Sequence, residues 1–99
     1  MTRPAPKAVV ESLDQIGTHL ANWRKLYGLK LDDVAQRAGI TRQTVARIEA
    51  GDPGVRIEHV LRVCRAVGIL ESVARAFDPF ETEIGKIRAE AFLKERVRR

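Results

Sequence analysis

Apolar residues recur at helical spacing from Leu31 to Ala50, on both sides of Gly39. A spacing of three and four residues places them on one face of a helix. Glycine is the residue that most readily takes the positive φ found just after a helix. The stretch therefore predicts two short helices joined by a tight turn, the second capped by Thr41. The positions expected to face inward are Val34, Ala35, Ala38, Ile40, Val45 and Ile48.

The same spacing predicts helices before and after this stretch. Ser12 and Gln15 form a capping-box pattern, from which a helix should reach Tyr27 and end at Gly28. For Val9 and Val10 the alternatives are that they extend this helix upstream or that they pack on a partner chain. Its apolar face contains Leu13, Ile16, Leu20, Trp23 and Tyr27. A fourth helix is expected at about Arg56–Val67, with Ile57, Val60, Leu61, Cys64 and Val67 on one face. A fifth is expected at about Leu70–Phe77.

These elements predict three parts of the chain. Residues 1–11, with two prolines, are expected to be a mobile tail. Residues 12–78 are expected to form one domain. Residues 79–99 are expected to be a weakly helical or disordered extension, because Gly85 interrupts the pattern and the chain ends in a charged run.

Composition restricts the fold and the location. The chain has 99 residues, of which 44% are hydrophobic but only 5% aromatic, so we expect an all-α domain with an aliphatic core. No apolar run approaches the roughly 18 residues needed to cross a bilayer, and the N-terminal residues lack a secretory pattern. With one cysteine and no possible internal disulfide, we expect a cytoplasmic protein without a membrane partner.

Charge is distributed unevenly along the chain. The net charge is +5, but residues 1–83 carry 12 basic and 11 acidic side chains, while residues 84–99 carry six and two. A basic chain is compatible with a nucleic-acid partner. Because the excess lies at the C-terminal end, however, charge gives little support for DNA binding by the residues before it.

The pattern of Leu31–Ala50 is typical of a helix-turn-helix, in which the second helix enters the major groove of double-stranded DNA. Ala35 and Gly39 are small enough for the two helices to cross closely. The outward residues suit base recognition, since arginine can pair with guanine, glutamine with adenine, and alanine can touch a thymine methyl. The alternative is an ordinary helical hairpin with a solvated polar face. The predicted base-reading residues are Arg42, Gln43, Ala46 and Arg47, flanked by Thr44.

The segment from Ile16 to Leu70 resembles the Cro/repressor helix-turn-helix family of the xenobiotic-response-element type. The residues that carry the resemblance are IGTHLANWRKLYGLKLDDVAQRAGITRQTVARIEAGDPGV, followed by VLRVCRAVGI. The resemblance implies a compact, five-helix fold like that of the lambda repressor. It also implies a structural ion pair between Arg24 and Glu49, where the alternative is two independent surface charges.

The resemblance further implies where phosphate contacts lie. They are expected at the start of the second helix and around the loop after the third, at Lys30, Thr41, Gly54, Val55 and Arg56. The chain departs from the family where members often have Ser-Gln, because it has Lys30 and Leu31 there. Asp52 also lies near the expected DNA path, and its negative charge is expected to lower affinity.

The C-terminal ERVRR gives a narrower resemblance to HipB-type antitoxins, which repress their own operon and bind a HipA-type kinase toxin. A basic terminus can also be a solubilising or nonspecific DNA-contacting tail. The expected function is a transcriptional repressor, autoregulating as an antitoxin and reading an inverted repeat as a homodimer. The alternatives are a stand-alone regulator and a toxin-binding module with secondary DNA binding. The predicted dimer interface is formed by Leu70, Val73, Phe77 and Phe80.

Enzymatic chemistry has little support in the sequence. His19 and His59 are the only histidines, and with Cys64 they form no pattern of metal ligands. Cys64 has apolar neighbours at helical spacing, which favours a core position over a nucleophile. We therefore expect a protein that is not an enzyme and that needs no metal or cofactor.

Overall fold

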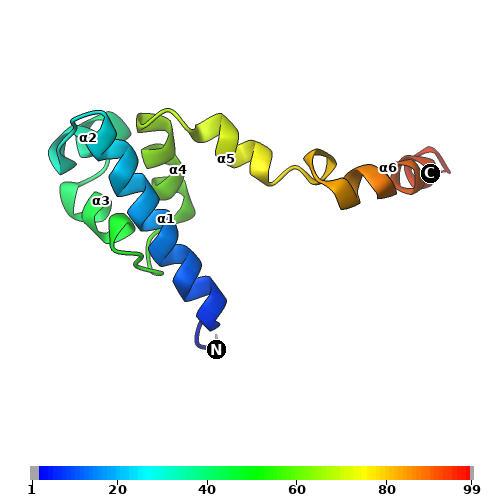
Figure 1. Ribbon diagram of the computed structural model, residues 1–99, viewed down its shortest axis with the longest axis horizontal. Coiled ribbons are helices and arrows are strands. Elements are labelled where there is room, and N and C mark those ends of the chain that lie inside the picture. Colours follow the sequence, from blue (N-terminus) through cyan, green and yellow to red (C-terminus); the bar gives the residue numbers. More distant parts are fainter. Residues whose placement is uncertain (1–2, 99) are drawn as a thin grey trace. The chain divides into compact units, whose positions relative to one another are not determined.

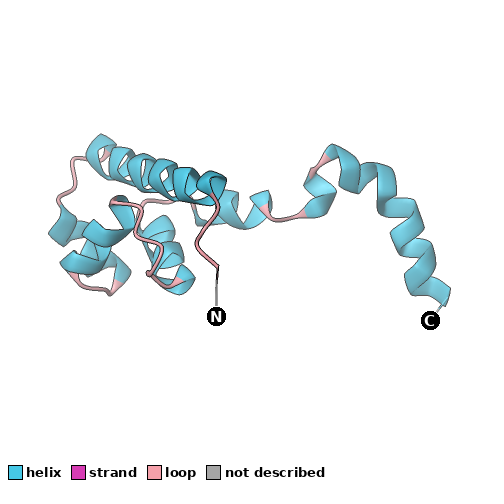
Figure 2. Cartoon of the chain, turned by 90° about the horizontal axis from the view of Figure 1, so that it is seen from below, coloured by secondary structure: helices cyan, strands magenta, loops and turns pink. Residues whose placement is uncertain are grey.

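The computed structural model describes the backbone of residues 3–98 and the side chains of residues 3–95. Its elements are α1 (Lys7–Leu26), α2 (Leu31–Ala38), α3 (Arg42–Glu49), α4 (Ile57–Ala66), α5 (Leu70–Ala76), the 3₁₀ turn η1 (Pro79–Glu81) and α6 (Glu83–Arg98) (Figure 1). The described residues form helices and loops without a strand (Figure 2). The all-helical class predicted from the sequence is therefore confirmed. No described helix is long and apolar enough to span a membrane.

The chain divides into two compact units, Met1–Ile69 and Leu70–Arg99. In the first unit α3 packs against each of α1, α2 and α4, and α2 also packs against α4. The core between them is aliphatic apart from one thiol: Leu20, Val34, Ala35, Ala38, Val45, Ile48, Val63, Cys64 and Val67. Five of the six inward positions expected around the central turn are buried, and Ile40 is half-buried.

The first helix begins earlier than the sequence predicted. It starts at Lys7 after Pro6, whose carbonyl accepts hydrogen bonds from the backbone N–H groups of Val9 and Val10. The helix therefore begins five residues before the expected start at Ser12, and Val9 and Val10 extend it upstream, which is one of the two alternatives for them. Residues 7–11 of the expected tail belong to α1. Pro6 is compatible with this start because the missing backbone N–H of an N-cap residue breaks no intrahelical hydrogen bond, while its carbonyl can still accept. Residues 1–2 lie outside the described residues.

Two apolar faces also differ from their expected pattern. Leu20 is buried in α1, but Ile16, Trp23 and Tyr27 are exposed. In α4 the fully buried residue is Val63, while Ile57 in the first turn is 68% exposed. The periodicity of apolar residues identifies the apolar face of a helix. Which turns of that face are buried depends on where the neighbouring helices end.

The backbones of α1 and α3 approach each other closely at Gly17, which is buried. A Cβ atom built there would overlap the backbone carbonyl of Glu49 and lie 2.7 Å from the carbonyl oxygen of Ile48. A real Cβ does not approach a backbone oxygen so closely. Only glycine therefore allows α1 to lie directly on the C-terminal turn of α3.

The second unit is helical over most of its C-terminal residues. The Asp78 carboxylate accepts from the Phe80 N–H at 2.9 Å, and the Thr82 hydroxyl accepts from the Gly85 N–H at 3.1 Å, which caps α6. The rings of Phe80 and Phe92 pack with centroids 5.5 Å apart. Gly85, taken from the sequence as a helix breaker, instead gives room for the Pro79 carbonyl, which a Cβ would overlap. The structure has a helix over Glu83–Arg98, in agreement with the helical alternative for this extension, while Arg99 lies outside the described residues.

The boundary after Asp78 stays a prediction. In the structure α5 groups with the C-terminal residues, because the chain divides at Ile69 and Leu70 and α5 contacts η1. The described geometry therefore defines two contact units whose boundary in the chain lies between Ile69 and Leu70.

Substituting Gly17 with alanine tests the close approach. In an exposed helix this change stabilises by about 1 kcal/mol. Here we expect Gly17→Ala to lower the free energy of unfolding by about 1–3 kcal/mol, because the added methyl group overlaps the backbone of α3. Urea unfolding followed by circular dichroism measures the change. Thr18→Ala, at the exposed neighbouring position, is the control and should be neutral or slightly stabilising. A stabilised Gly17→Ala variant would contradict the proposed packing.

Candidate nucleic-acid interface

The turn between α2 and α3 is built from local hydrogen bonds. Gly39 has φ of 71°, and its N–H and that of Ile40 both donate to the Ala35 carbonyl, at 2.9 and 3.1 Å. The Thr41 hydroxyl then accepts from the Thr44 N–H at 3.1 Å and caps α3. The Thr41 and Thr44 hydroxyl oxygens also lie 2.8 Å apart in a hydrogen bond. These contacts set the direction in which α3 leaves α2.

The two sides of α3 have different environments. Val45 is fully buried and Ile48 is 3% exposed, so one side of the helix belongs to the core. The structure brings the predicted base-reading residues together on the opposite side: Arg42, Gln43, Ala46 and Arg47 are exposed and Thr44 is half-buried. Two cations and an amide thus project from an eight-residue helix whose other face is held in the protein.

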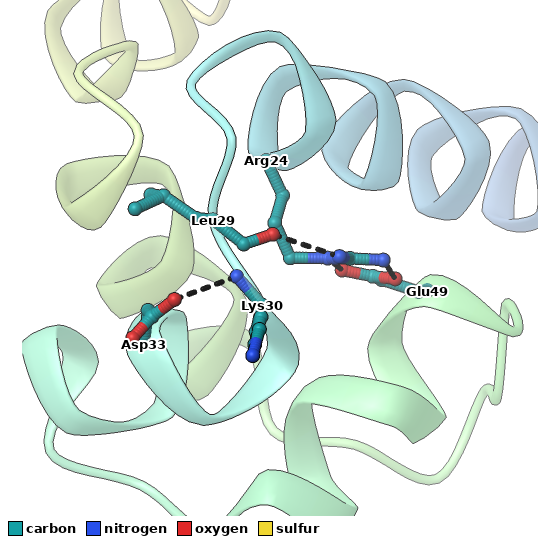
Figure 3. Close-up of polar contacts among 5 residues, drawn as sticks. All are labelled: Arg24, Leu29, Lys30, Asp33 and Glu49. Atoms are coloured by element: carbon teal, nitrogen blue, oxygen red, sulfur yellow. Dashed lines mark hydrogen bonds and ion pairs between the residues drawn. The ribbon is translucent and has the colours of Figure 1, made fainter.

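The end of α3 is joined to α1 by the Arg24–Glu49 ion pair (Figure 3). Arg24 Nε donates to Glu49 Oε2 at 2.8 Å and Nη2 to Oε1 at 3.0 Å. Its Nη1 donates to the Leu29 carbonyl at 3.0 Å. The two side chains are only 14% and 12% exposed, and the hydrogen bond to Glu49 raises the pKa of Arg24 above its usual value. This is the pair that the family resemblance implied.

The start of α2 is capped without the Ser-Gln pair seen in the family. The Lys30 backbone N–H donates to the Asp33 carboxylate at 2.7 Å (Figure 3). The Lys30 side chain is exposed. Across the turn, Arg42 Nε lies 3.4 Å from Asp32 Oδ1, with both side chains mostly exposed. The first turn of α2 therefore holds two carboxylates, Asp32 and Asp33, and the exposed Lys30 side chain precedes them at the N-cap.

Asp52 organises the loop after α3 through two hydrogen bonds, which the sequence did not predict. Its carboxylate accepts from Arg47 Nε and from the Gly54 N–H, each at 2.7 Å. The hydrogen bond from Arg47 is the largest cause that holds the pKa of the Asp52 carboxyl below its usual value, and the hydrogen bond from the Gly54 N–H acts in the same direction. The run Asp52-Pro53-Gly54 predicted the turn. In a common type of turn an aspartate accepts a hydrogen bond from the backbone N–H two residues later, and this pattern could have identified the contact between Asp52 and Gly54.

The residues expected to bind phosphate occupy different situations. The Gly54 N–H already donates to Asp52, so it is not the free amide that was expected. Val55 is half-buried, and Arg56 is exposed at the position before α4. The Thr41 hydroxyl serves as the cap of α3. Lys30 and Arg56 are thus the two cations of this set with exposed side chains.

The predicted dimer residues all belong to the second unit. Leu70 and Val73 are half-buried and Phe77 is 77% exposed. Phe80 packs on Phe92 within its own unit, so part of its apolar surface already has a partner.

The remaining candidate chemistry lies in the core. Cys64 is 3% exposed, and burial raises the pKa of its thiol, which disfavours the reactive thiolate. Among the described residues, no three or more His, Cys, Asp or Glu side chains form a group that could hold a metal ion.

Comparison with known families agrees with this geometry. Residues 15–77, more than half of the chain, match the helix-turn-helix domain family. The fold and the α2–turn–α3 geometry define a helix-turn-helix protein, and the family match supports the Cro/repressor type. The chain belongs to the helix-turn-helix domain family, which indicates a DNA-binding regulator. No curated protein matches the chain.

Breaking the Arg24–Glu49 pair tests its contribution to the free energy of unfolding. Because both side chains are largely buried, removing one partner leaves the other charge without compensation. We expect Arg24→Met and Glu49→Gln each to lower the free energy of unfolding by about 2–4 kcal/mol, measured by urea unfolding. The decrease in the free energy of unfolding of the double variant should be smaller than the sum of the two single decreases. Strictly additive losses would show that the side chains act independently.

Proposed function

We propose that the chain is a sequence-specific transcriptional repressor that reads double-stranded DNA with α3. The observation that carries this proposal is the exposed face of α3, which presents Arg42, Gln43 and Arg47 while Val45 and Ile48 hold the opposite face in the core. A polar helix face needs such support to act in recognition, because side chains must meet base edges in a defined register.

Each proposed base-reading side chain has a chemical counterpart in the major groove. Arg42 and Arg47 can donate two hydrogen bonds to the O6 and N7 atoms of guanine. Gln43 can pair with the N6 and N7 atoms of adenine. Ala46 can pack against a thymine methyl group, and Thr44 lies at the edge of this set.

Phosphate contacts are proposed on both sides of α3. The exposed Lys30 and Arg56 side chains supply charge, and the backbone N–H of Val55 and the hydroxyl of Thr41 supply hydrogen-bond donors. Gly54 contributes room in the loop, and its N–H becomes available to phosphate only if Asp52 releases it. Such contacts position the protein without reading sequence.

We propose that repression occurs by occupancy of a promoter and that a homodimer binds an inverted repeat. One recognition helix reads only a few base pairs, and a dimer doubles the site, with half-sites about one helical turn apart. The proposed dimer surface consists of the apolar side of α5 and two residues that follow it: Leu70, Val73, Phe77 and Phe80. Phe77 and Phe80 support this choice, because they are 77% and 43% exposed and together supply apolar surface that a partner can cover.

Alanine substitution in α3 tests the base-reading assignment. On a DNA duplex selected by the full-length protein from random sequences, we expect Arg42→Ala and Gln43→Ala each to weaken binding by about 1–3 kcal/mol. Fluorescence anisotropy titration measures the affinity. Arg65→Ala in α4 and Gln15→Ala in α1, both at exposed positions outside the proposed interface, should bind as the original protein does. Unchanged affinity in both α3 variants would refute the assignment of α3.

The dimer surface has a separate test. We expect Phe77→Ser to shift the protein toward the monomer in sedimentation velocity, because it removes an exposed apolar ring from the proposed interface. Arg75→Ser, on another side of α5, is the matched control. If the Phe77 variant sediments as the original protein does, the interface lies elsewhere.

The narrower form of the proposal is an autoregulating antitoxin that binds a HipA-type kinase toxin. It rests on the C-terminal ERVRR and on the basic character of residues 84–99. We expect deletion of residues 84–99 to abolish or strongly weaken capture of a HipA-type kinase encoded beside this chain, measured by calorimetry. Undiminished affinity would remove the tail from the proposed interface. A chain that binds the kinase but shows no selected DNA sequence would favour the toxin-binding module instead.

A further inference from the structure

The two arginines on the exposed face of α3 are held differently. Arg47 Nε donates to Asp52 Oδ2 at 2.7 Å, which is a short, charge-assisted hydrogen bond. Arg42 Nε lies 3.4 Å from Asp32 Oδ1, and those side chains are 65% and 77% exposed. Arg47 therefore has a defined carboxylate partner, whereas Arg42 has only a loose electrostatic neighbour.

Asp52 is itself fixed by the loop that carries it. Its backbone N–H donates to the Arg47 carbonyl at 3.1 Å, and its second carboxylate oxygen accepts from the Gly54 N–H at 2.7 Å. Gly51, with φ of 77°, packs so closely on Asp14 of α1 that a Cβ would overlap that residue. The carboxylate is thus anchored to the end of α3 and to the following turn before it contacts the guanidinium.

Gly54 leaves the space that this arrangement needs. A Cβ built at Gly54 would lie 3.3 Å from Arg47 Nη2 and 3.2 Å from Asp52 Oδ1, which is closer than most real contacts. The guanidinium therefore lies directly against the backbone of the turn. Because Nε is occupied by Asp52, the terminal amino groups remain to donate to a ligand.

We propose that Asp52 is a specificity-determining positioning residue, which orients the Arg47 guanidinium so that its terminal amino groups meet a guanine edge. The proposal rests on the proposed function, since it assumes that α3 reads DNA. Asp52 acts through Arg47 and touches no base. Its carboxylate also repels the nearby phosphates, so it lowers affinity for all DNA while raising discrimination at one base pair.

The Arg47–Asp52 ion pair is expected to contribute little to the stability of the fold. The Arg47 and Asp52 side chains are 45% and 34% exposed, and ion pairs at exposed sites contribute little to folding. An arginine with free rotamers, however, loses side-chain entropy when it binds a base. Holding the guanidinium beforehand removes part of that loss, and it does so only for the base that matches the held geometry.

The experiment uses the full chain and DNA duplexes that it selects from random sequence. Arg47→Ala first identifies the base pair whose preference depends on Arg47. Asp52→Asn is then titrated against duplexes that differ only at that base pair and against an unrelated duplex. This substitution keeps an oxygen that can accept from the Gly54 N–H while removing the charge. Arg47→Lys keeps the cation but loses the Nε contact. Glu11→Gln, which removes a carboxylate paired with Lys7 in α1, controls for net charge.

We expect Asp52→Asn and Arg47→Lys to reduce the preference at that base pair by about fivefold or more. Affinity of the Asp52→Asn variant for the unrelated duplex should be equal or higher, because one negative charge near phosphate is lost. The Arg47→Ala/Asp52→Asn double variant should show the same preference as Arg47→Ala alone. Glu11→Gln should keep the original preference.

The proposal is overturned if Asp52→Asn keeps the original preference, or if it weakens binding to every duplex equally. It is also overturned if Arg47→Ala changes no base preference. Failure of the unsubstituted protein to select any sequence is a different result, since it refutes the proposed function itself. Circular dichroism of each variant checks that the helices are intact, and Arg47→Lys tests the same contact from its other side.

Discussion

The position of α3 depends on how α1 holds its C-terminal turn. Arg24 reaches from α1 to the Glu49 carboxylate through two hydrogen bonds and to the Leu29 carbonyl through a third. Gly17, two turns earlier in α1, lets the backbones approach directly. Since Val45 and Ile48 fill the core at the same time, the exposed face of α3 cannot rotate without breaking a buried ion pair or a packed interface. The orientation of the proposed reading face follows from these contacts.

Two arginine–carboxylate pairs at the end of α3 differ in environment. The Arg24–Glu49 pair is 14% and 12% exposed, so its loss leaves a poorly solvated charge and affects folding. The Arg47–Asp52 pair is 45% and 34% exposed, so solvent screens it and it adds little to stability. An arginine–carboxylate ion pair thus fixes α3 on α1 in the case of Arg24 and Glu49. In our proposal, the pair of Arg47 and Asp52 instead orients the Arg47 side chain toward DNA. Burial makes the difference.

Most of the helix-turn-helix geometry could be predicted from the sequence, because it is local. The bounds of α2, the positive φ of Gly39 and the cap at Thr41 all depend on residues within four positions of one another. The Arg24–Glu49 pair required the family resemblance, since no local pattern joins residues 25 positions apart. The start of α1 was missed because the capping-box pattern at Ser12 competed with an uninterrupted helical run from Lys7.

The sequence by itself determined an all-helical chain, the place of its central turn and the residues on the outward face of α3, because periodicity and capping are properties of neighbouring residues. Only the tertiary structure decided that Gly17 is a contact site, that Ile57 is exposed and that the Gly54 N–H is already used by Asp52. It also decided that Gly85 permits α6, since the Pro79 carbonyl lies where a side chain would be. A glycine has the same intrinsic propensity everywhere, and only its neighbours in space determine whether it interrupts a helix or allows a close contact.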